Sequence, residues 1–245
     1  MKNIKLTIEY DGTNYFGWQK QNNALGIQEV IEKAIGKITN EEVELIGSSR
    51  TDTGVHASGF VANFKTNSNI PSDRFKDAIN SKLPSDIVIL RSEEVKEEFH
   101  ARYNSLGKTY VYTILNRREA KAIGRNYMYH FKQQLNLEDM SRACEYFIGT
   151  HDFESFKNKG SSVKTSVRTI TELNVSKNGD IIEVKVTADG FLYNMVRIIV
   201  GTLLEVGTGK IKPEAIMDIL QSKDRTKAGK SAPALGLCLK QVYYN

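Results

Sequence analysis

The amino-acid sequence predicts an α+β fold made of two similar halves, each with the element order β-α-β-β-α-β. Segments in which apolar and polar side chains alternate, as in strands, are separated by segments in which apolar side chains recur every three or four residues, as in helices. This order occurs twice along the 245 residues, and no low-complexity linker divides the two copies. We therefore expect two α/β halves that pack tightly.

The first half contains six expected elements. In order, they are a strand over residues 4–10, a helix over 27–38, two strands over 43–48 and 60–64, a helix from Ser72 that carries Phe75, Ile79 and Leu83, and a strand over 87–90. The two middle strands flank a polar loop, and Ser72 is expected to cap the second helix through its side chain.

The second half repeats the pattern. Its elements are a strand over 108–115, a helix from Leu137, two strands over 168–176 and 181–188, a helix over 196–204, a short helix after Pro213 and a strand over 236–243. The dipeptide Asn178-Gly179, between two of these strands, predicts a tight hairpin turn of type I′.

Each half fits a split β-α-β unit of the ferredoxin-like kind. We take residues 1–102 as the N-terminal half, which carries the polar loop, and residues 103–245 as the C-terminal half. Joining the two sheets edge to edge would protect their exposed strands. We therefore expect one mixed, mainly antiparallel sheet with a central cleft.

Composition favours a globular protein of the cytoplasm. Hydrophobic residues make up 40% of the chain, enough for a packed core. The N-terminus lacks the apolar run of a signal peptide, and the longest apolar stretch, residues 191–206, contains Asn194 and Arg197 and is too short to cross a bilayer. Cys144, Cys238 and the four histidines lack the spacing of metal ligands, so no metal site and no disulfide framework are expected.

Positive charge is concentrated in the second half. Residues 1–100 hold 12 Lys and Arg against 15 Asp and Glu, whereas residues 101–245 hold 22 against 14. Much of the excess lies in three stretches, residues 102–132, 157–168 and 223–230. Clustered cations attract phosphates and release counterions, so this charge fits a polyanionic partner as well as an ordinary solvated surface.

The most unusual segment runs from Gly47 to Ala57 and reads GSSRTDTGVHA. It lies between two predicted strands, where a sheet would hold a loop in place. A carboxylate that serves as a nucleophile must be ionised, and the nearby Arg50 guanidinium favours the ionised form of Asp52. The alternative is a structural turn in which Asp52 accepts a hydrogen bond from neighbouring backbone.

Eight ordered motifs resemble one known family over the whole length of the chain. They are Tyr10–Gln19 (YDGTNYFGWQ), Arg50–Ala57 (RTDTGVHA), Phe99–Arg102 (FHAR), Lys108–Tyr112 (KTYVY), Gly149–Phe156 (GTHDFESF), Phe191–Arg197 (FLYNMVR), Asp224–Thr226 (DRT) and Ala232–Leu237 (APALGL). Together they resemble the tRNA pseudouridine synthase A family, whose loop usually reads GRTDxGVHA; Ser49 stands where the family often has glycine. The resemblance implies the pseudouridine synthase fold and the isomerisation of uridine to pseudouridine in tRNA.

The resemblance also implies roles for four residues. Asp52 matches the nucleophilic aspartate, Tyr110 the tyrosine that stacks on the target uracil, Arg197 the basic residue that pairs with the aspartate, and Arg50 an arginine linked to displacing the target base from its stack. No cofactor is implied, because a uracil moves within one nucleotide and nothing is oxidised or exchanged. Whether Asp52 attacks C1′ or C6 stays open.

The resemblance further implies uridines 38, 39 and 40 of the anticodon stem-loop as targets and a homodimer as the active form. The reaction has no evident need for a second titrating base, so His56, His100 and His151 are expected to be structural. Trp18 is expected to pack beneath the cleft rather than to touch RNA.

Two other functions fit the sequence less well. A non-catalytic RNA-binding protein would display aromatic side chains on central strands, but the K/R-G-F/Y run of RNA-recognition motifs is absent. A hydrolase that used Asp52 as nucleophile or base would usually have a second carboxylate or a metal-ligand cluster, and the sequence has neither pattern.

Overall fold

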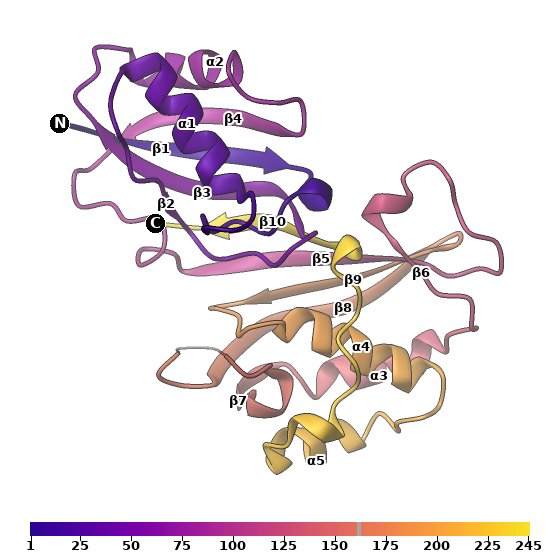
Figure 1. Cartoon of the computed structure of the whole chain (residues 1–245). Coiled ribbons are helices and arrows are strands. Elements are labelled where there is room, and N and C mark those ends of the chain that lie inside the picture. The colour runs from indigo at the N-terminus through magenta and orange to yellow at the C-terminus, as the bar shows by residue number, and fades with distance from the viewer. Residues whose placement is uncertain (161–162) are drawn as a thin grey trace. The chain divides into compact units, whose positions relative to one another are not determined.

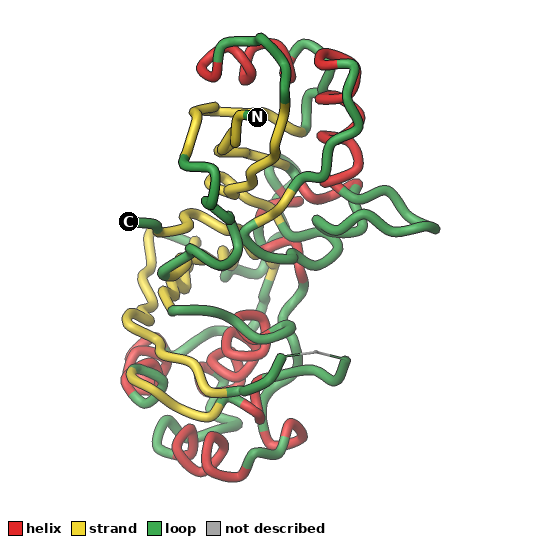
Figure 2. Tube along the Cα trace, turned by 90° about the vertical axis from the view of Figure 1, so that its left-hand side faces the viewer, coloured by secondary structure: helices red, strands yellow, loops and turns green. Residues whose placement is uncertain are grey.

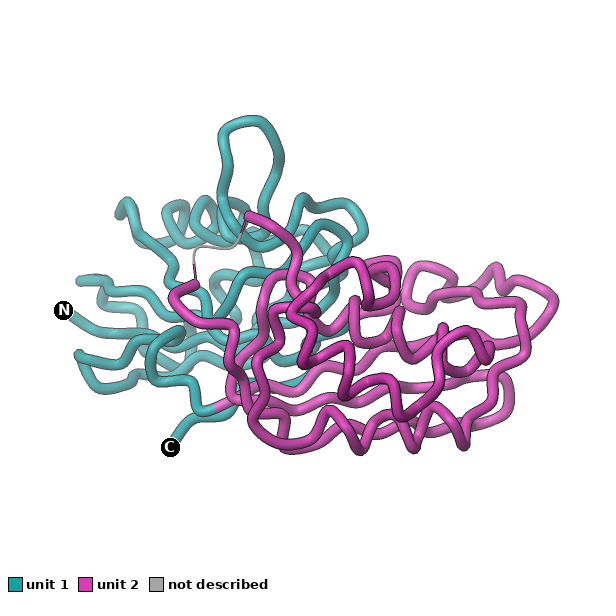
Figure 3. Tube along the Cα trace, turned by 90° about the horizontal axis from the view of Figure 1, so that it is seen from below, with its two compact units in different colours: residues 1–106, 238–245 teal, residues 107–237 magenta. Residues whose placement is uncertain are grey.

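The chain folds into two compact units in a computed structural model that describes residues 1–160 and 163–245. The first unit comprises residues 1–106 and 238–245, and the second comprises residues 107–237 (Figure 3). The ranges expected from the sequence, 1–102 and 103–245, put the last strand in the second half. In the structure this strand pairs within the first unit, because β3 has an edge available to it.

The first unit has the predicted element order β-α-β-β-α-β. Its elements are β1 (Lys2–Tyr10), α1 (Ile27–Thr39), β2 (Ile46–Gly47), β3 (His56–Thr66), α2 (Phe75–Asn80) and β4 (Ile87–Val95), followed by β10 (Leu237–Tyr243) from the end of the chain. β1 pairs antiparallel with both β3 and β4, whereas β10 pairs parallel with β3. β2 pairs antiparallel with β3 further along the same edge.

Two predictions for the first unit were wrong in detail. The strand expected over residues 43–48 is reduced to β2, because side chains of α1 take up the Leu45 backbone: its N–H donates to Glu32 at 3.0 Å, and its carbonyl accepts from Gln28 at 3.1 Å. Ser72 does not cap a helix through its side chain. It opens a short 3-10 turn, which follows Pro71 and leads into α2.

The core of the first unit lies between the sheet and its helices. Ile4, Leu6 and Ile8 of β1 face Phe64, Ala62 and Phe60 of β3, and all six are fully buried. α1 lies across the strands with α2 beside it (Figure 1), and Phe75 of α2 meets Phe64 edge-on at 5.5 Å between ring centroids. Each such side chain contributes roughly 1.5–3 kcal/mol of burial free energy, so this sheet is a rigid support for its loops.

The second unit is also a mixed, mainly antiparallel sheet, and it combines strands with helices (Figure 2). Its elements are β5 (Gly107–Leu115), β6 (Tyr129–His130), α3 (Leu137–Glu145), β7 (Gly149–Asp152), β8 (Val167–Asn178), β9 (Ile181–Ala188), α4 (Met195–Gly207) and α5 (Ala215–Ser222). The strand order is β5-β9-β8-β7, and β6 pairs parallel with β5. The predicted α+β class is confirmed in both units.

The short strands β6 and β7 were not predicted, since two and four residues are too few to show an alternating pattern. The hairpin turn between β8 and β9 also differs from the prediction. Its two loop residues are Gly179 and Asp180, and only Gly179 has a positive φ, of 57°. A type I′ turn needs positive φ at both positions, so the predicted type was wrong.

Among residues 1–160 and 163–245, no helix is long and apolar enough to cross a membrane. Ser161 and Ser162, which belong to the basic stretch 157–168, lie outside the described residues.

Candidate active site

The loop that carries Asp52 is held by backbone hydrogen bonds to the segment that follows β1. We call residues 48–55, between β2 and β3, the Asp52 loop. The Trp18 N–H donates to the Thr51 carbonyl at 3.2 Å, and the Gly54 N–H donates to the Tyr15 carbonyl at 3.3 Å. Within the loop, the Val55 N–H donates to the Asp52 carbonyl at 3.1 Å. The motifs YDGTNYFGWQ and RTDTGVHA therefore form one folded structure.

Two glycines of the first motif allow this close approach. A Cβ atom at Gly12 would overlap the Val55 carbonyl, and one at Gly17 would overlap the Thr51 carbonyl. Gly17 also has a φ of 85°, a conformation that side chains disfavour. Sequence reasoning did not assign these glycines a role, although their place in a motif next to the loop motif was a usable signal.

Aromatic side chains fill the space beneath the loop. Trp18 is only 3% exposed and stacks on Phe60 with 3.9 Å between centroids, which confirms that it packs in the interior. The Tyr10 hydroxyl is within hydrogen-bond distance of the Thr51 hydroxyl, at 2.9 Å. A loop supported by stacked rings and paired hydroxyls holds its backbone in one conformation.

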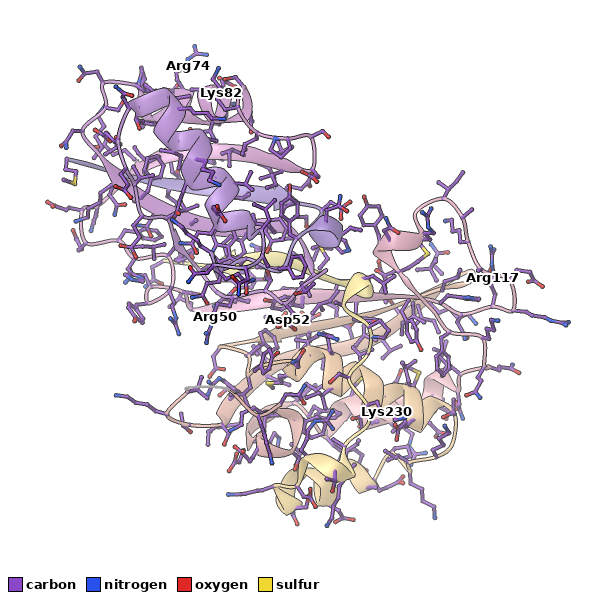
Figure 4. All side chains as sticks on the ribbon, viewed as in Figure 1. Arg50, Asp52, Arg74, Lys82, Arg117 and Lys230 are labelled. Carbon is purple, nitrogen blue, oxygen red and sulfur yellow. The ribbon has the colours of Figure 1, made fainter. Side chains whose placement is uncertain are left out.

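Asp52 itself is half-buried, and Arg50 is exposed (Figure 4). In the part of the chain that the structure describes, no carboxylate lies within 4.0 Å of Arg50, so the expected influence of its guanidinium on the ionisation of Asp52 stays a prediction. Only Thr51 lies between the two residues in the sequence, and it is buried. Arg50 thus stands ready for a group outside the protein.

His56 lies in the core at the start of β3, as expected of a structural histidine. It is 5% exposed, and its Nδ1 lies 3.1 Å from the Gly12 amide nitrogen and 3.1 Å from a carboxylate oxygen of Asp11. The ring therefore ties the Asp52 loop to the turn after β1.

In the second unit, Tyr110 projects from β5 onto the buried face of the sheet. Tyr110 is 6% exposed, and its ring meets Phe191 edge-on at 5.1 Å. Its strand neighbour Val186 is also buried. Phe191 was part of a recognised motif but had no assigned role; its contact fixes the plane of the Tyr110 ring.

Arg197 is in the first turn of α4 and is held by its own unit. Its Nε donates to the Ala232 carbonyl at 2.7 Å, and its Nη1 donates to the Asn194 side-chain oxygen at 2.7 Å. In return, the Ala232 N–H donates to the Arg197 carbonyl at 2.9 Å. Asn194, which precedes α4, has a left-handed φ of 61°. These bonds set the direction of the guanidinium before any substrate arrives.

The segment that holds Arg197 runs directly against α4. A Cβ at Gly201 would overlap the Lys230 carbonyl, and the Gly229 N–H donates to the Thr202 hydroxyl at 2.9 Å. Further along, the Tyr112 hydroxyl donates to the Pro233 carbonyl at 2.7 Å. Burial raises the pKa of Tyr112, and the positive charge of Arg197 opposes that rise. Tyr112 is therefore a neutral structural anchor.

Other side chains are poor candidates for chemistry. Burial raises the pKa of the Cys144 thiol to about 12, so it is not a thiolate nucleophile. Within residues 1–160 and 163–245, no group of three or more His, Cys, Asp or Glu side chains is arranged to hold a metal ion. The arrangement supplies a rigidly held carboxylate in one unit, and an ordered aromatic ring and guanidinium in the other.

Comparison with known proteins points to one family. Residues 6–104 and 143–245 match a family described as tRNA pseudouridine synthase. The chain is 63% identical over 244 residues to tRNA pseudouridine synthase A 2 of Clostridium perfringens, and the match covers 100% of both chains. It is 60% identical over 246 residues to the protein of the same name from Clostridium tetani, covering 100% of this chain and 99% of the relative.

More distant matches follow. tRNA pseudouridine synthase A of Clostridium acetobutylicum is 57% identical over 244 residues, covering 100% of both chains. Among solved structures, a chain of the archaeal box H/ACA sRNP Nop10-Cbf5 complex covers 82% of this chain and 44% of its own length, with a TM-score of 0.38 and 11% identity.

Proposed function

Because the chain belongs to the tRNA pseudouridine synthase family, we propose that it isomerises uridine to pseudouridine at positions 38, 39 and 40 of the tRNA anticodon stem-loop, with Asp52 as its nucleophile. The observation that supports this most directly is the Asp52 loop: a half-buried carboxylate on a backbone that is hydrogen-bonded to a second family motif. The enzyme is an isomerase.

The reaction breaks the C1′–N1 bond of uridine and joins the same uracil to C1′ through C5. N1 gains a proton and C5 loses one, so the product has the same atoms as the substrate. Asp52 forms a temporary covalent bond, to C1′ of the sugar or to C6 of the base, and leaves when the new bond is made. The net change is the transfer of one proton from C5 to N1, so the reaction consumes no other reactant.

Three other residues assist in this proposal. Tyr110 stacks on the uracil and keeps the detached ring from escaping, a contact worth roughly 1–3 kcal/mol. Arg197 pairs with Asp52 and keeps it ionised; the bonds from Ala232 and Asn194 that orient its guanidinium support this role. Arg50, which is exposed, fills the space left when the target base leaves its stack, offsetting part of a cost of a few kcal/mol.

We further propose that the enzyme acts in the cytoplasm as a homodimer, as the family resemblance implies. Sedimentation of the purified chain tests the oligomeric state directly. A monomer at micromolar concentration, both alone and with tRNA, would contradict it.

The substrate assignment is tested with the unmodified protein and tRNA transcripts labelled with tritium at C5 of uridine. Attachment of C1′ at C5 releases that tritium to water. A transcript with uridine at position 38, 39 or 40 should release tritium, and the same transcript with cytidine at all three positions should not. Equal release from both transcripts, or release from neither, would contradict the proposal.

A further inference from the structure

We propose that residues 100–104, which we call the His100 turn, form a platform that binds a nucleotide next to the target uridine, with its base stacked on Tyr103 and its phosphate paired with Arg102. This inference rests on the proposed function, because it takes tRNA as the substrate. It gives a role to the FHAR motif, which the chemistry at Asp52 does not use.

The turn is closed by its own hydrogen bonds. The Asn104 N–H donates to the His100 carbonyl at 3.0 Å, and the His100 N–H donates to the Asn104 side-chain oxygen at 2.7 Å. The N–H groups of Arg102 and Tyr103 both point at Nδ1 of His100, at 3.2 and 3.3 Å. These four hydrogen bonds hold the five residues of the turn in a single fixed arrangement.

Buried polar groups attach this turn to the sheet. The Ala101 N–H donates to Asn63 at 2.8 Å, and Asn63 donates to Asn3 at 2.9 Å. The Tyr244 hydroxyl donates to the Ala101 carbonyl at 2.6 Å. Asn3 and Asn63 are at most 2% exposed. Breaking any of these bonds would leave a buried polar group unpaired, which is costly, so the platform is rigid.

The same anchor places the His100 turn beside the Asp52 loop. Asn63 of β3 is the register partner of Ile46, and Gly47 then leads into the loop. Successive strand residues point to opposite faces. Asn63 therefore points away from the face on which Phe64 packs against α2. The turn is thus anchored two residues along β3 from Val61, whose carbonyl accepts a hydrogen bond at 2.8 Å from the N–H of Ser48, the first residue of the Asp52 loop.

The side chains that the turn displays suit RNA. Tyr103 is 75% exposed, and its ring lies 4.2 Å from the His100 ring at an angle of 31°. The Arg102 guanidinium lies 5.7 Å from the centroid of the Tyr103 ring. In the described ranges 1–160 and 163–245, no carboxylate lies within 4.0 Å of Arg102. An ordered exposed ring binds a base by stacking, and an exposed arginine without an acidic partner binds a phosphate.

A contrast within the first unit supports this reading. Arg74, at the α2 end of the unit and far from Asp52 in Figure 4, lies 3.8 Å from Asp73 and 3.7 Å from Asp77. Its charge is already neutralised by acids of its own turn. Arg102 is not neutralised in this way, and it is the cation next to the exposed ring.

Binding of an anticodon stem-loop RNA by full-length variants tests the stacking. Tyr103→Ala should weaken binding about 5- to 150-fold, the range that corresponds to about 1–3 kcal/mol per stacked base, while Tyr103→Phe should bind within about twofold of the parent. Leu90→Ala, which removes an exposed apolar side chain from β4, is the matched control and should bind normally. Equal binding by Tyr103→Ala and the parent overturns the platform.

An abasic scan identifies the nucleotide. Removing the stacked base should weaken binding to the parent but not to Tyr103→Ala, since that variant has already lost the contact. If each abasic substitution around the target uridine weakened binding to Tyr103→Ala as much as binding to the parent, Tyr103 would not stack on a base. That result would overturn the platform and favour a protein partner for this surface.

The phosphate contact is tested by salt dependence. Arg102→Ala should reduce the slope of log Kd against log salt by about 0.7–0.9, the change for one phosphate contact, and Arg74→Ala should leave it unchanged. An unchanged slope in Arg102→Ala overturns this part of the proposal.

Tritium release by the parent separates the two hypotheses. A parent that releases tritium while Tyr103→Ala binds as tightly as the parent contradicts the platform alone. A parent that binds the stem-loop in a Tyr103-dependent way but releases no tritium contradicts the proposed function and leaves the platform supported. Failure of the parent to bind contradicts both.

Discussion

Backbone groups help to position both Asp52 and Arg197. The Asp52 loop is held by the Trp18 N–H and the Tyr15 carbonyl, and Arg197 by the carbonyl and N–H of Ala232. Backbone groups neither ionise nor change rotamer, so these hydrogen bonds do not depend on the titration of a side chain. This backbone support also makes the glycines that permit the close contacts as important as the charged residues.

Gly17→Ala should therefore lower both stability and activity. The new Cβ would overlap the Thr51 carbonyl in a residue with a φ of 85°. We expect a loss of about 2–4 kcal/mol in the free energy of unfolding, measured with urea. Gly209→Ala is the matched control: its φ is 75°, but its Cβ would meet nothing within 4 Å, so it should lose only about 1–2 kcal/mol. Equal losses would show that the contact with Thr51 is not what requires glycine.

Tyr110 acts through its ring in this account. Tyr110→Phe should bind tRNA nearly as tightly as the parent, because stacking survives, whereas Tyr110→Ala should bind about 5- to 150-fold more weakly. Fluorescence anisotropy with a labelled stem-loop measures both. Similar losses in the two variants would contradict a stacking role.

At the scale of elements, α4 and the segment from Gly229 to Pro233 behave as one structure. The helix is buried along most of its length, and Gly201 lets the segment run directly against it. Because Ala232 of this segment holds the Arg197 side chain, a change at Gly201 is transmitted to a residue of the proposed active site.

Gly201→Ala should thus reduce tritium release at least tenfold while α4 stays helical by circular dichroism. Its Cβ would overlap the Lys230 carbonyl and push the segment away. Gly36→Ala, inside α1, is the control and should release tritium like the parent. Its Cβ would lie 3.2 Å from the Glu41 carbonyl, and alanine favours helix by roughly 0.5–1 kcal/mol. Full activity in Gly201→Ala would show that this contact does not position Arg197.

Local patterns predicted the elements well and the pairings less well. The alternating apolar residues of β1 and the helical spacing in α1 define these elements without reference to the rest of the chain. The pairing of β10 with β3 joins residues that are more than 180 positions apart in sequence. The short strands β6 and β7 are strands only because a neighbouring strand offers an edge. No local pattern contains that information.

The same limit applies to the candidate site. The motifs pointed to Asp52, Tyr110, Arg197 and Arg50 as candidates, but they carried no information on the groups that hold these side chains. The groups that orient Arg197, the Ala232 carbonyl and the Asn194 side chain, come from a loop and a left-handed residue. The spacing of apolar residues in the sequence predicts neither of these groups.

For the whole molecule, we expect the division of charge to govern how tRNA is bound. Residues 101–245 carry 22 basic against 14 acidic residues, whereas residues 1–100 have a small acidic excess. Each phosphate contact contributes a slope of about −0.7 to −0.9 to log K against log salt. We expect tRNA binding to weaken at least about twentyfold between 50 and 200 mM salt, as for three or more contacts. A salt-independent Kd would contradict the basic stretches as the tRNA surface.

The central claim is that the Asp52 carboxylate forms a temporary bond to the target nucleotide, and a single-turnover assay with Asp52→Asn tests it most directly. The amide has nearly the same shape, so the variant should still bind tRNA but should release no tritium from C5 with enzyme in excess. Asp73→Asn, which changes an exposed carboxylate near α2, should react like the parent. Pseudouridine formed by Asp52→Asn at a rate near that of the parent would contradict the claim.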